Sequence, residues 1–154
     1  HLALPVVDID RTELERTDFA PFRALAHAPL AMTAHIVFTD IDPTAPATSS
    51  KTVIDEVIRG TIGFDGALMT DDICMKALKG TFTDRVRASI AAGCDLVLHC
   101  LRDMDEMREV AAAAPILSGK ARERCDRALA MLKPSKPFAI AEAQSRVDAA
   151  LAQV

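Results

Sequence analysis

The sequence predicts an α/β fold built on parallel strands. Three short apolar runs, at residues 31–38, 66–70 and 95–100, alternate with segments of helical periodicity at intervals of roughly 30 residues. That spacing fits right-handed βαβ crossovers, in which a helix returns the chain to the start of the next parallel strand. Three strands are too few for a doubly wound sheet of ordinary width. We therefore expect part of a (β/α)8 barrel.

The helical segments between these strands are recognised by their caps and breakers. They cover residues 12–27 in two pieces, 50–59, 72–78, 84–92, 103–114, 118–133 and 138–154. Most begin after a Ser, Thr or Asp and end at a glycine or proline, the residues that favour the two ends of a helix.

Composition narrows the classes of function. With a net charge of -4 and neither Trp nor Tyr, the chain lacks the basic surface and stacking aromatics typical of nucleic-acid binding. Its apolar runs are far shorter than the roughly 20 residues that a membrane-spanning helix needs. Cys74, Cys94, Cys100 and Cys125 form no CxxC and no metal-ligand spacing. We therefore expect four reduced thiols in a cytoplasmic protein that binds neither nucleic acid nor membrane.

Polar side chains lie at the ends of the predicted strands. The middle run ends in Asp71 and Asp72, the first run carries His35, and the third ends near His99. The carboxyl ends of parallel strands share one edge, where sheets and barrels place their chemistry. Asp72 is explained as the cap of the following helix. For Asp71, position alone leaves a catalytic role and a capping or ion-paired role open, and both histidines are typical of hydrogen-bonded structural residues.

A series of short motifs runs through residues 1–115. In order, they are His1-Leu2-Ala3-Leu4-Pro5, Phe19-Ala20-Pro21-Phe22-Arg23, Met32-Thr33-Ala34-His35-Ile36, Pro46-Ala47-Thr48-Ser49-Ser50, Gly63-Phe64-Asp65-Gly66, Met69-Thr70-Asp71-Asp72-Ile73-Cys74-Met75 and Ala92-Gly93-Cys94-Asp95-Leu96-Val97-Leu98. Together they resemble glycoside hydrolase family 3, and within it the single-domain bacterial β-N-acetylglucosaminidases of the NagZ type. One such motif would be weak, but this many in order is a strong resemblance.

The resemblance implies roles for four residues. It makes Asp71 the nucleophile and His1 the general acid/base, and it places Met75 and His35 among the substrate-binding residues. Hydrolysis with retention needs a carboxylate that attacks the anomeric carbon and a group that protonates the leaving oxygen. Histidine titrates near neutrality without a tuned environment, which suits the second role.

The same resemblance implies the wider function. Residues 1–154 would form the carboxyl-terminal half of a single (β/α)8 barrel domain, with no second domain. The implied enzyme releases N-acetylglucosamine from peptidoglycan-derived fragments (GlcNAc-1,6-anhydro-MurNAc peptides) and uses no metal or organic cofactor. A different specificity, such as that of a β-glucosidase, and a catalytically incomplete fragment are the alternatives. We expect the chain to require the upstream half of its barrel, because sheet edges would otherwise be uncovered.

Overall fold

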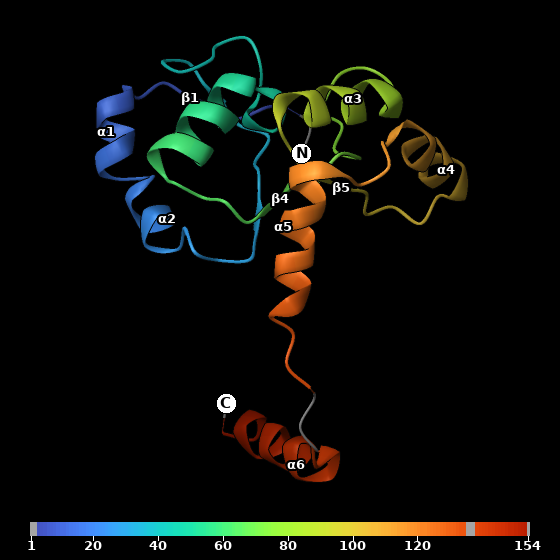
Figure 1. Cartoon of the computed structure of the whole chain (residues 1–154). Helices are drawn as coiled ribbons and strands as arrows, with labels where there is room; N and C mark the ends of the chain where they lie inside the picture. The colour runs from blue at the N-terminus through green and yellow to red at the C-terminus, as the bar shows by residue number, and fades with distance from the viewer. Residues whose placement is uncertain (1–2, 135–137, 154) are drawn as a thin grey trace.

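A three-stranded parallel sheet lies at the centre of the fold (Figure 1). The structure is a computed structural model that describes residues 3–134 and 138–153. The strand order is β2-β4-β5, with β2 at Leu30–Met32, β4 at Ala67–Asp72 and β5 at Leu96–Leu98. Each pair is parallel, so the carboxyl ends of the three strands share one edge. The predicted α/β class with parallel strands is confirmed.

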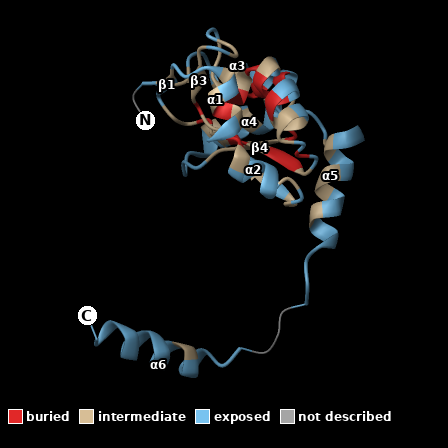
Figure 2. Ribbon diagram, turned by 90° about the vertical axis from the view of Figure 1, so that its left-hand side faces the viewer, coloured by how far each residue is buried: buried red, intermediate tan, exposed pale blue. Residues whose placement is uncertain are grey.

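The central strand β4 is buried by helices on one face of the sheet. Leu68 is 1% exposed and packs in one apolar cluster with Ile54 of helix η2 (Val53–Thr61) and Ala92 of helix α3 (Phe82–Ala92). Figure 2 shows buried residues concentrated in β4 and α3, whereas the last two helices are mainly exposed. Burying apolar area on this face is the main stabilising contribution that the sheet offers.

The opposite face of the sheet is open along β2. Ala31 is paired with Leu68 and packs on the helix-covered side. Because successive side chains of a strand alternate between faces, Leu30 and Met32 point the other way. They are 49% and 50% exposed. The sheet therefore presents an uncovered apolar surface within the described part of the chain.

The prediction of a single strand at residues 31–38 is wrong, because the structure has two short strands in this region. β2 ends at Met32, and β3 (Val37–Phe38) pairs instead with β1 (Val6–Val7) in a separate parallel ladder. Between them, the side chains of Thr33 and His35 turn inward and bond to other segments, so the backbone leaves the ladder.

The helix predicted at residues 72–78 is also wrong. β4 continues through Asp72, and the following residues form turns. The Asp72 carboxylate accepts hydrogen bonds from the backbone N–H groups of Cys74 (3.0 Å) and Cys100 (3.2 Å), and the second of these is a contact across the sheet edge. Arg85 on α3 donates to the carbonyls of Ile73 and Leu78 at 2.6 and 2.7 Å. These contacts replace the backbone bonds that a helix would make.

The other helices follow the predicted order. They are α1 (Arg11–Arg16), α2 (Ala20–Ala24), the 3-10 turn η1 (Ala47–Ser49), α4 (Met104–Ala113), α5 (Gly119–Ala130) and α6 (Ile140–Leu151). Asp103, at the predicted start of its helix, caps α4, and Gly93 ends α3 with a φ of 117°, in the left-handed region that favours glycine. Across residues 3–134 and 138–153, none of the helices has the length and apolar character to cross a membrane.

Candidate active site at the carboxyl edge of the sheet

Asp71 lies at the end of β4, where the pairing with β5 is irregular. Met69 pairs with Leu96, but Asp72 pairs with Leu98, so β4 has one more residue than β5 over this stretch. This is the count of a β-bulge, which re-aims nearby side chains and is frequent beside active sites. The half-buried Asp71 is within the irregular segment.

The Asp71 carboxylate is held by the backbone and not by an opposite charge. Its Oδ1 accepts the backbone N–H of Asp72 at 2.7 Å, and its own backbone N–H donates to Thr33 Oγ1 at 3.3 Å. Within residues 3–134 and 138–153, no arginine, lysine or histidine forms an ion pair with Asp71. The ion-paired alternative for this residue therefore has no partner in the described structure.

A buried chain of hydroxyl and imidazole groups supports this end of β4. Thr33 Oγ1 lies 2.9 Å from Thr48 Oγ1, which lies 2.8 Å from His35 Nδ1. His35 Nε2 lies 2.9 Å from the Asp72 carbonyl, which can only accept, so Nε2 is the donor in that bond, and the Thr48 hydroxyl also donates to the Ala34 carbonyl at 3.1 Å. This series of hydrogen bonds starts at the backbone N–H of Asp71 and ends at the backbone carbonyl of Asp72. It therefore holds the peptide group before Asp71 and the peptide group after Asp72.

The predicted site residues take different positions in this arrangement. Asp71 is at the strand end, and His35 is 3% exposed, with both ring nitrogens bonded inside the protein. Its observed contacts are structural, and a contact with substrate stays a prediction. Met75 is half-buried in the turn after β4, where its role also stays a prediction. His1 lies outside the described residues.

Asp72 has the structural role that its neighbours define. Burial alone would raise the pKa of its carboxyl group, but the Cys74 thiol and the N–H groups of Cys74 and Cys100 donate to it, and the pKa is lowered overall. Because this carboxylate already accepts several donors, it ties the turn after β4 to the end of β5. It caps a turn and not the predicted helix.

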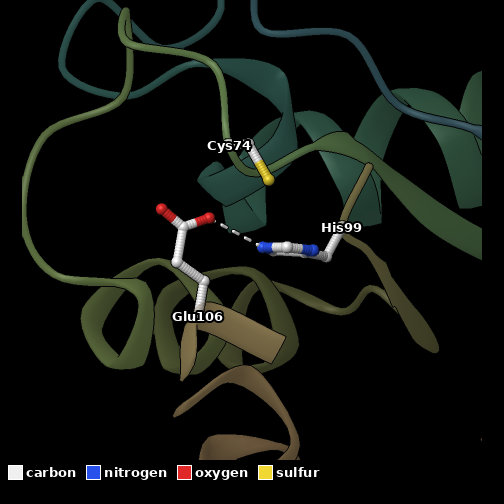
Figure 3. A group of neighbouring side chains, drawn as sticks. All are labelled: Cys74, His99 and Glu106. Atoms are coloured by element: carbon white, nitrogen blue, oxygen red, sulfur yellow. Dashed lines mark hydrogen bonds and ion pairs between the residues drawn. The ribbon is translucent and has the colours of Figure 1, made fainter. Parts of the chain in front are cut away.

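A second cluster lies beside this turn. His99 Nε2 lies 3.1 Å from Glu106 Oε2, and the Cys74 thiol points to the same place (Figure 3). The ring of Phe82 packs edge-on against His99 at a centroid distance of 5.6 Å. The sequence placed His99 at a strand end, but it gave no reason to connect it with Glu106, because helix α4 had to be positioned first.

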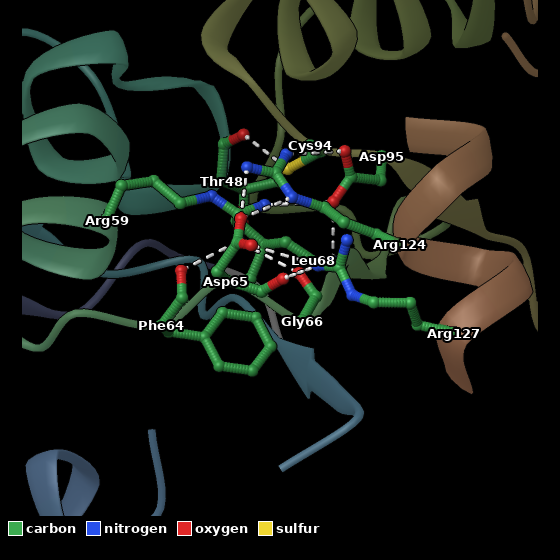
Figure 4. Close-up of polar contacts among 10 residues, drawn as sticks. All are labelled: Thr48, Arg59, Phe64, Asp65, Gly66, Leu68, Cys94, Asp95, Arg124 and Arg127. Carbon is green, nitrogen blue, oxygen red and sulfur yellow. Dashed lines mark hydrogen bonds and ion pairs between the residues drawn. The ribbon is translucent and has the colours of Figure 1, made fainter. Parts of the chain in front are cut away.

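The opposite edge of the sheet holds a dense network of paired charges (Figure 4). Asp95 accepts from Arg59 at 2.9 Å and from Arg124 at 3.1 Å, and it also accepts the Leu68 backbone N–H at 2.9 Å. Asp65 accepts from Arg124 and Arg127, both at 2.9 Å. Every carboxylate of this network has an arginine partner, so it serves stability and not chemistry.

The sequence did not predict the supporting residues of the site. Thr48 and Arg85 are separated from Asp71 along the chain and belong to no chemical motif. One signal was available for Thr48, since its segment Pro46–Ser50 was among the motifs of the family resemblance. For Arg85 there was none, because its three carbonyl acceptors exist only once the predicted helix is replaced by turns.

Comparison with known proteins identifies the fold family. The family model described as "Glycosyl hydrolase family 3 N terminal domain" matches residues 1–131. The chain belongs to this family. It is 46% identical over 104 residues to a β-hexosaminidase of Alkalilimnicola ehrlichii, an alignment that covers 65% of this chain and 30% of that protein. The chain thus spans less than a third of the length of this curated relative.

Solved structures agree with this assignment. A family 3 β-N-acetylglucosaminidase from Paenibacillus sp. str. FPU-7 superposes with a TM-score of 0.73 at 29% identity, covering 90% of this chain and 30% of that one. NagZ from Neisseria gonorrhoeae, in complex with N-trifluoroacetyl-D-glucosamine, gives a TM-score of 0.70 at 34% identity, covering 83% and 37%. The architecture predicted from sequence, part of a family 3 barrel domain, is confirmed.

Proposed function

We propose that this chain carries the nucleophile of a retaining exo-β-N-acetylglucosaminidase. The observation that carries the proposal is the position of Asp71, a half-buried carboxylate without a cationic partner in the described structure, at the carboxyl end of the central strand. The carboxyl ends of barrel strands are where enzymes of this architecture place catalytic residues.

In the proposed reaction, Asp71 attacks the anomeric carbon of a terminal N-acetylglucosamine and forms a covalent glycosyl-enzyme. His1 donates a proton to the departing oxygen and then accepts one from the water that releases the sugar. The N–H of Asp72 and the Thr33–Thr48–His35 chain hold Asp71 in place during both steps. No metal or organic cofactor takes part in these steps.

The substrate class is supported by the relatives. The similarity to β-hexosaminidases, and to a NagZ that binds an N-acylated glucosamine, favours N-acetylglucosamine over glucose. We propose GlcNAc-1,6-anhydro-MurNAc peptides derived from peptidoglycan as the substrate and the cytoplasm as the compartment. The uncovered apolar face at Leu30 and Met32 supports a requirement for further strands of the same single-domain barrel.

Covalent trapping tests the nucleophile. The full-length enzyme is treated with a 5-fluoro derivative of an activated N-acetylglucosaminide, and the adduct is located by intact-mass and peptide-mass analysis. The expected result is one glycosyl group on Asp71, absent from Asp71→Asn and present in Asp65→Asn. A glycosyl group on any other residue would overturn the assignment.

The leaving-group dependence tests His1. Replacing His1 with Ala in the full-length enzyme is expected to slow hydrolysis by roughly 10²–10⁴-fold, as loss of a general acid does. Substrates with acidic leaving groups should lose much less, since they depart without a proton. An equal loss on all leaving groups would contradict an acid role. Comparing aryl N-acetylglucosaminides with aryl glucosides separates the proposed specificity from that of a β-glucosidase.

A further inference from the structure

Three side chains with the donor atoms of a zinc site meet beside the proposed active site, although none of them belongs to it. Cys74 comes from the turn after β4, His99 from the end of β5, and Glu106 from the first turn of α4. One donor atom from each, a sulfur, a ring nitrogen and a carboxylate oxygen, lies within 4.8 Å of the other two. Figure 3 shows the Cys74 sulfur and one Glu106 oxygen both directed at the Nε2 edge of His99.

The histidine in this group has a largely buried side chain and brings one of its two ring nitrogens to the cluster. His99 has a side chain that is 7% exposed, and its Nδ1 has no hydrogen-bond partner among the described residues. His35 differs, because both of its ring nitrogens are bonded. The three side chains meet at Nε2 and not at Nδ1, so the donor atoms that converge are Nε2, the Cys74 sulfur and one Glu106 oxygen.

The distances between the donor atoms are close to those around a tetrahedrally coordinated ion. Around an ion with metal–ligand distances of about 2.0–2.3 Å, donor atoms lie about 3.3–3.8 Å apart. The pair of His99 Nε2 and Glu106 Oε2, at 3.1 Å, is already near this value. The thiol needs to move by about an ångström at most to reach it, since all three atoms lie within 4.8 Å. This movement would take the thiol away from the Asp72 carboxylate, to which it donates in the structure.

The set of donors selects the ion. Hard cations such as Mg²⁺ and Ca²⁺ are bound by oxygen atoms, whereas a set of one thiolate, one imidazole and one carboxylate suits Zn²⁺. Three protein ligands leave a fourth position for water. We propose that Cys74, His99 and Glu106 bind one Zn²⁺ ion, which joins the turn after β4 to the end of β5 and to helix α4. The sequence predicted no metal, so the proposal departs from that expectation.

A bound ion would restrict the movement of the turn that directly follows the proposed nucleophile. Cys74 and Met75 share this turn, three and four residues beyond Asp71. Arg85 already holds the turn through backbone carbonyls, and Zn²⁺ would add a bond to a second helix. The inference does not depend on the proposed reaction, because zinc binding is measured directly and without a sugar substrate.

Metal titration of the full-length protein tests the proposal. Metal-free protein is titrated with Zn²⁺ in competition with a chromophoric chelator, and separately with Co²⁺, whose charge-transfer absorption reports a thiolate ligand. We expect one Zn²⁺ per chain and a thiolate band with Co²⁺. Cys74→Ser should abolish the band and weaken Zn²⁺ binding by more than the roughly 10–100-fold that loss of an outer-shell partner costs.

Two further variants keep the test decisive. Glu106→Gln changes a partly exposed helical residue, so it should fold and still weaken Zn²⁺ binding, even where Cys74→Ser is unstable. Cys125→Ser removes a thiol on α5 outside the cluster and should bind as the parent does. Absence of binding at micromolar free Zn²⁺ would overturn the proposal. Binding that is lost in Asp71→Asn but retained in Cys74→Ser and Glu106→Gln would also overturn it, because the ion would then lie at the active-site carboxylate.

Discussion

The two edges of the central sheet use carboxylates in opposite ways. At the amino edge, Asp65 and Asp95 are each bound by two arginines, with N–O distances of 2.9–3.1 Å. At the carboxyl edge, Asp71 has no ion pair in the described structure, and its one recorded donor is a backbone N–H. The carboxylates of both edges are held by hydrogen bonds, but only those of Asp65 and Asp95 are neutralised by arginines.

This difference follows from what holds each edge in place. Arg59 donates to the carbonyls of Phe64 and Gly66 and to Asp95, so one guanidinium fixes the loop that enters β4. At the other end, the strand is held by the hydroxyls of Thr33 and Thr48 and by the His35 ring, with no carboxylate–arginine pair among them. A carboxylate positioned by neutral donors keeps its negative charge available for an electrophile, whereas one bound by two arginines does not.

The largest expected effect separates the two edges by activity. Asp71→Asn in the full-length enzyme should lower kcat by roughly 10⁴–10⁶-fold, the range seen when a nucleophilic unit is disabled. Asp65→Asn, at the amino edge, should leave kcat unchanged. Steady-state kinetics with an aryl N-acetylglucosaminide measures both, and circular dichroism checks the fold. If Asp71→Asn retained a tenth of the parent kcat, the carboxyl edge would not be the catalytic one.

The second prediction separates the edges by stability. Arg59→Met removes one partner of Asp95, whose side chain is 5% exposed, and also leaves two part-buried carbonyls without this donor. We expect a loss of about 3 kcal/mol in the free energy of unfolding, the lower end for a broken buried pair, because Arg124 still contacts Asp95. Urea unfolding monitored by circular dichroism measures it.

The control for this change is an ion pair at the surface. Arg11→Met removes ion pairs with Glu15 and Glu56. The three side chains of these pairs are 35–54% exposed. Its cost should be below about 1 kcal/mol. Equal losses in Arg59→Met and Arg11→Met would show that burial does not distinguish the amino-edge network.

A third variant tests the neutral support of the carboxyl edge. Thr48→Val keeps the shape of a side chain that is 1% exposed but removes the hydroxyl between Thr33 and His35. We expect a loss of about 1–3 kcal/mol, because buried polar groups are left unpaired. A fall in kcat of roughly 10–100-fold should accompany it, since small displacements of a catalytic group are costly.

Thr83→Val is the matched control for Thr48→Val. The hydroxyl of Thr83, on α3, donates to Glu109 of α4, and it forms no hydrogen bond with β4 among the described residues. Its kcat should equal that of the parent. If both threonine variants lowered kcat alike, the hydroxyl chain would have no special part in positioning Asp71.

The sequence was informative where structure is local. The apolar run that ends in Asp71 predicted a buried strand, and Asp103 predicted the start of α4, because strands and caps depend on adjacent residues. The prediction of a helix at 72–78 was wrong because two long-range contacts hold this segment in turns. The Asp72 carboxylate accepts from Cys100, 28 residues away, and Arg85 donates to carbonyls that would accept backbone N–H groups in a helix. Such contacts between distant segments override local preference.

The candidate site was predicted only in part for the same reason. Asp71 was identified by its place at a strand end, and the family resemblance then favoured one of two adjacent carboxylates. The bulge that sets its direction is a mismatch between β4 and β5, which neither strand reveals alone. Likewise, the meeting of Cys74, His99 and Glu106 depends on how α4 packs beside β5.

The smallest expected effect concerns the exposed part of the amino-edge network. The hydrogen bond from Arg124 lowers the pKa of the Asp65 carboxyl below its ordinary value. A lowered pKa in the folded state means that the unfolded state binds the proton more readily. The stability that Asp65 contributes is therefore complete above its unfolded pKa of about 3.9 and is lost as the pH falls through the folded value.

Because Asp65 is largely exposed, its contribution above that pH should be well below 1 kcal/mol. Urea unfolding of the parent and of Asp65→Asn at a series of pH values from neutral to acid measures the difference, which should shrink as the pH falls. Arg124→Gln should remove most of this pH dependence, and adding Asp65→Asn to it should change little more. A difference that grew on acidification would mean that Asp65 is destabilising when charged, and the amino edge would then not be the neutralised one.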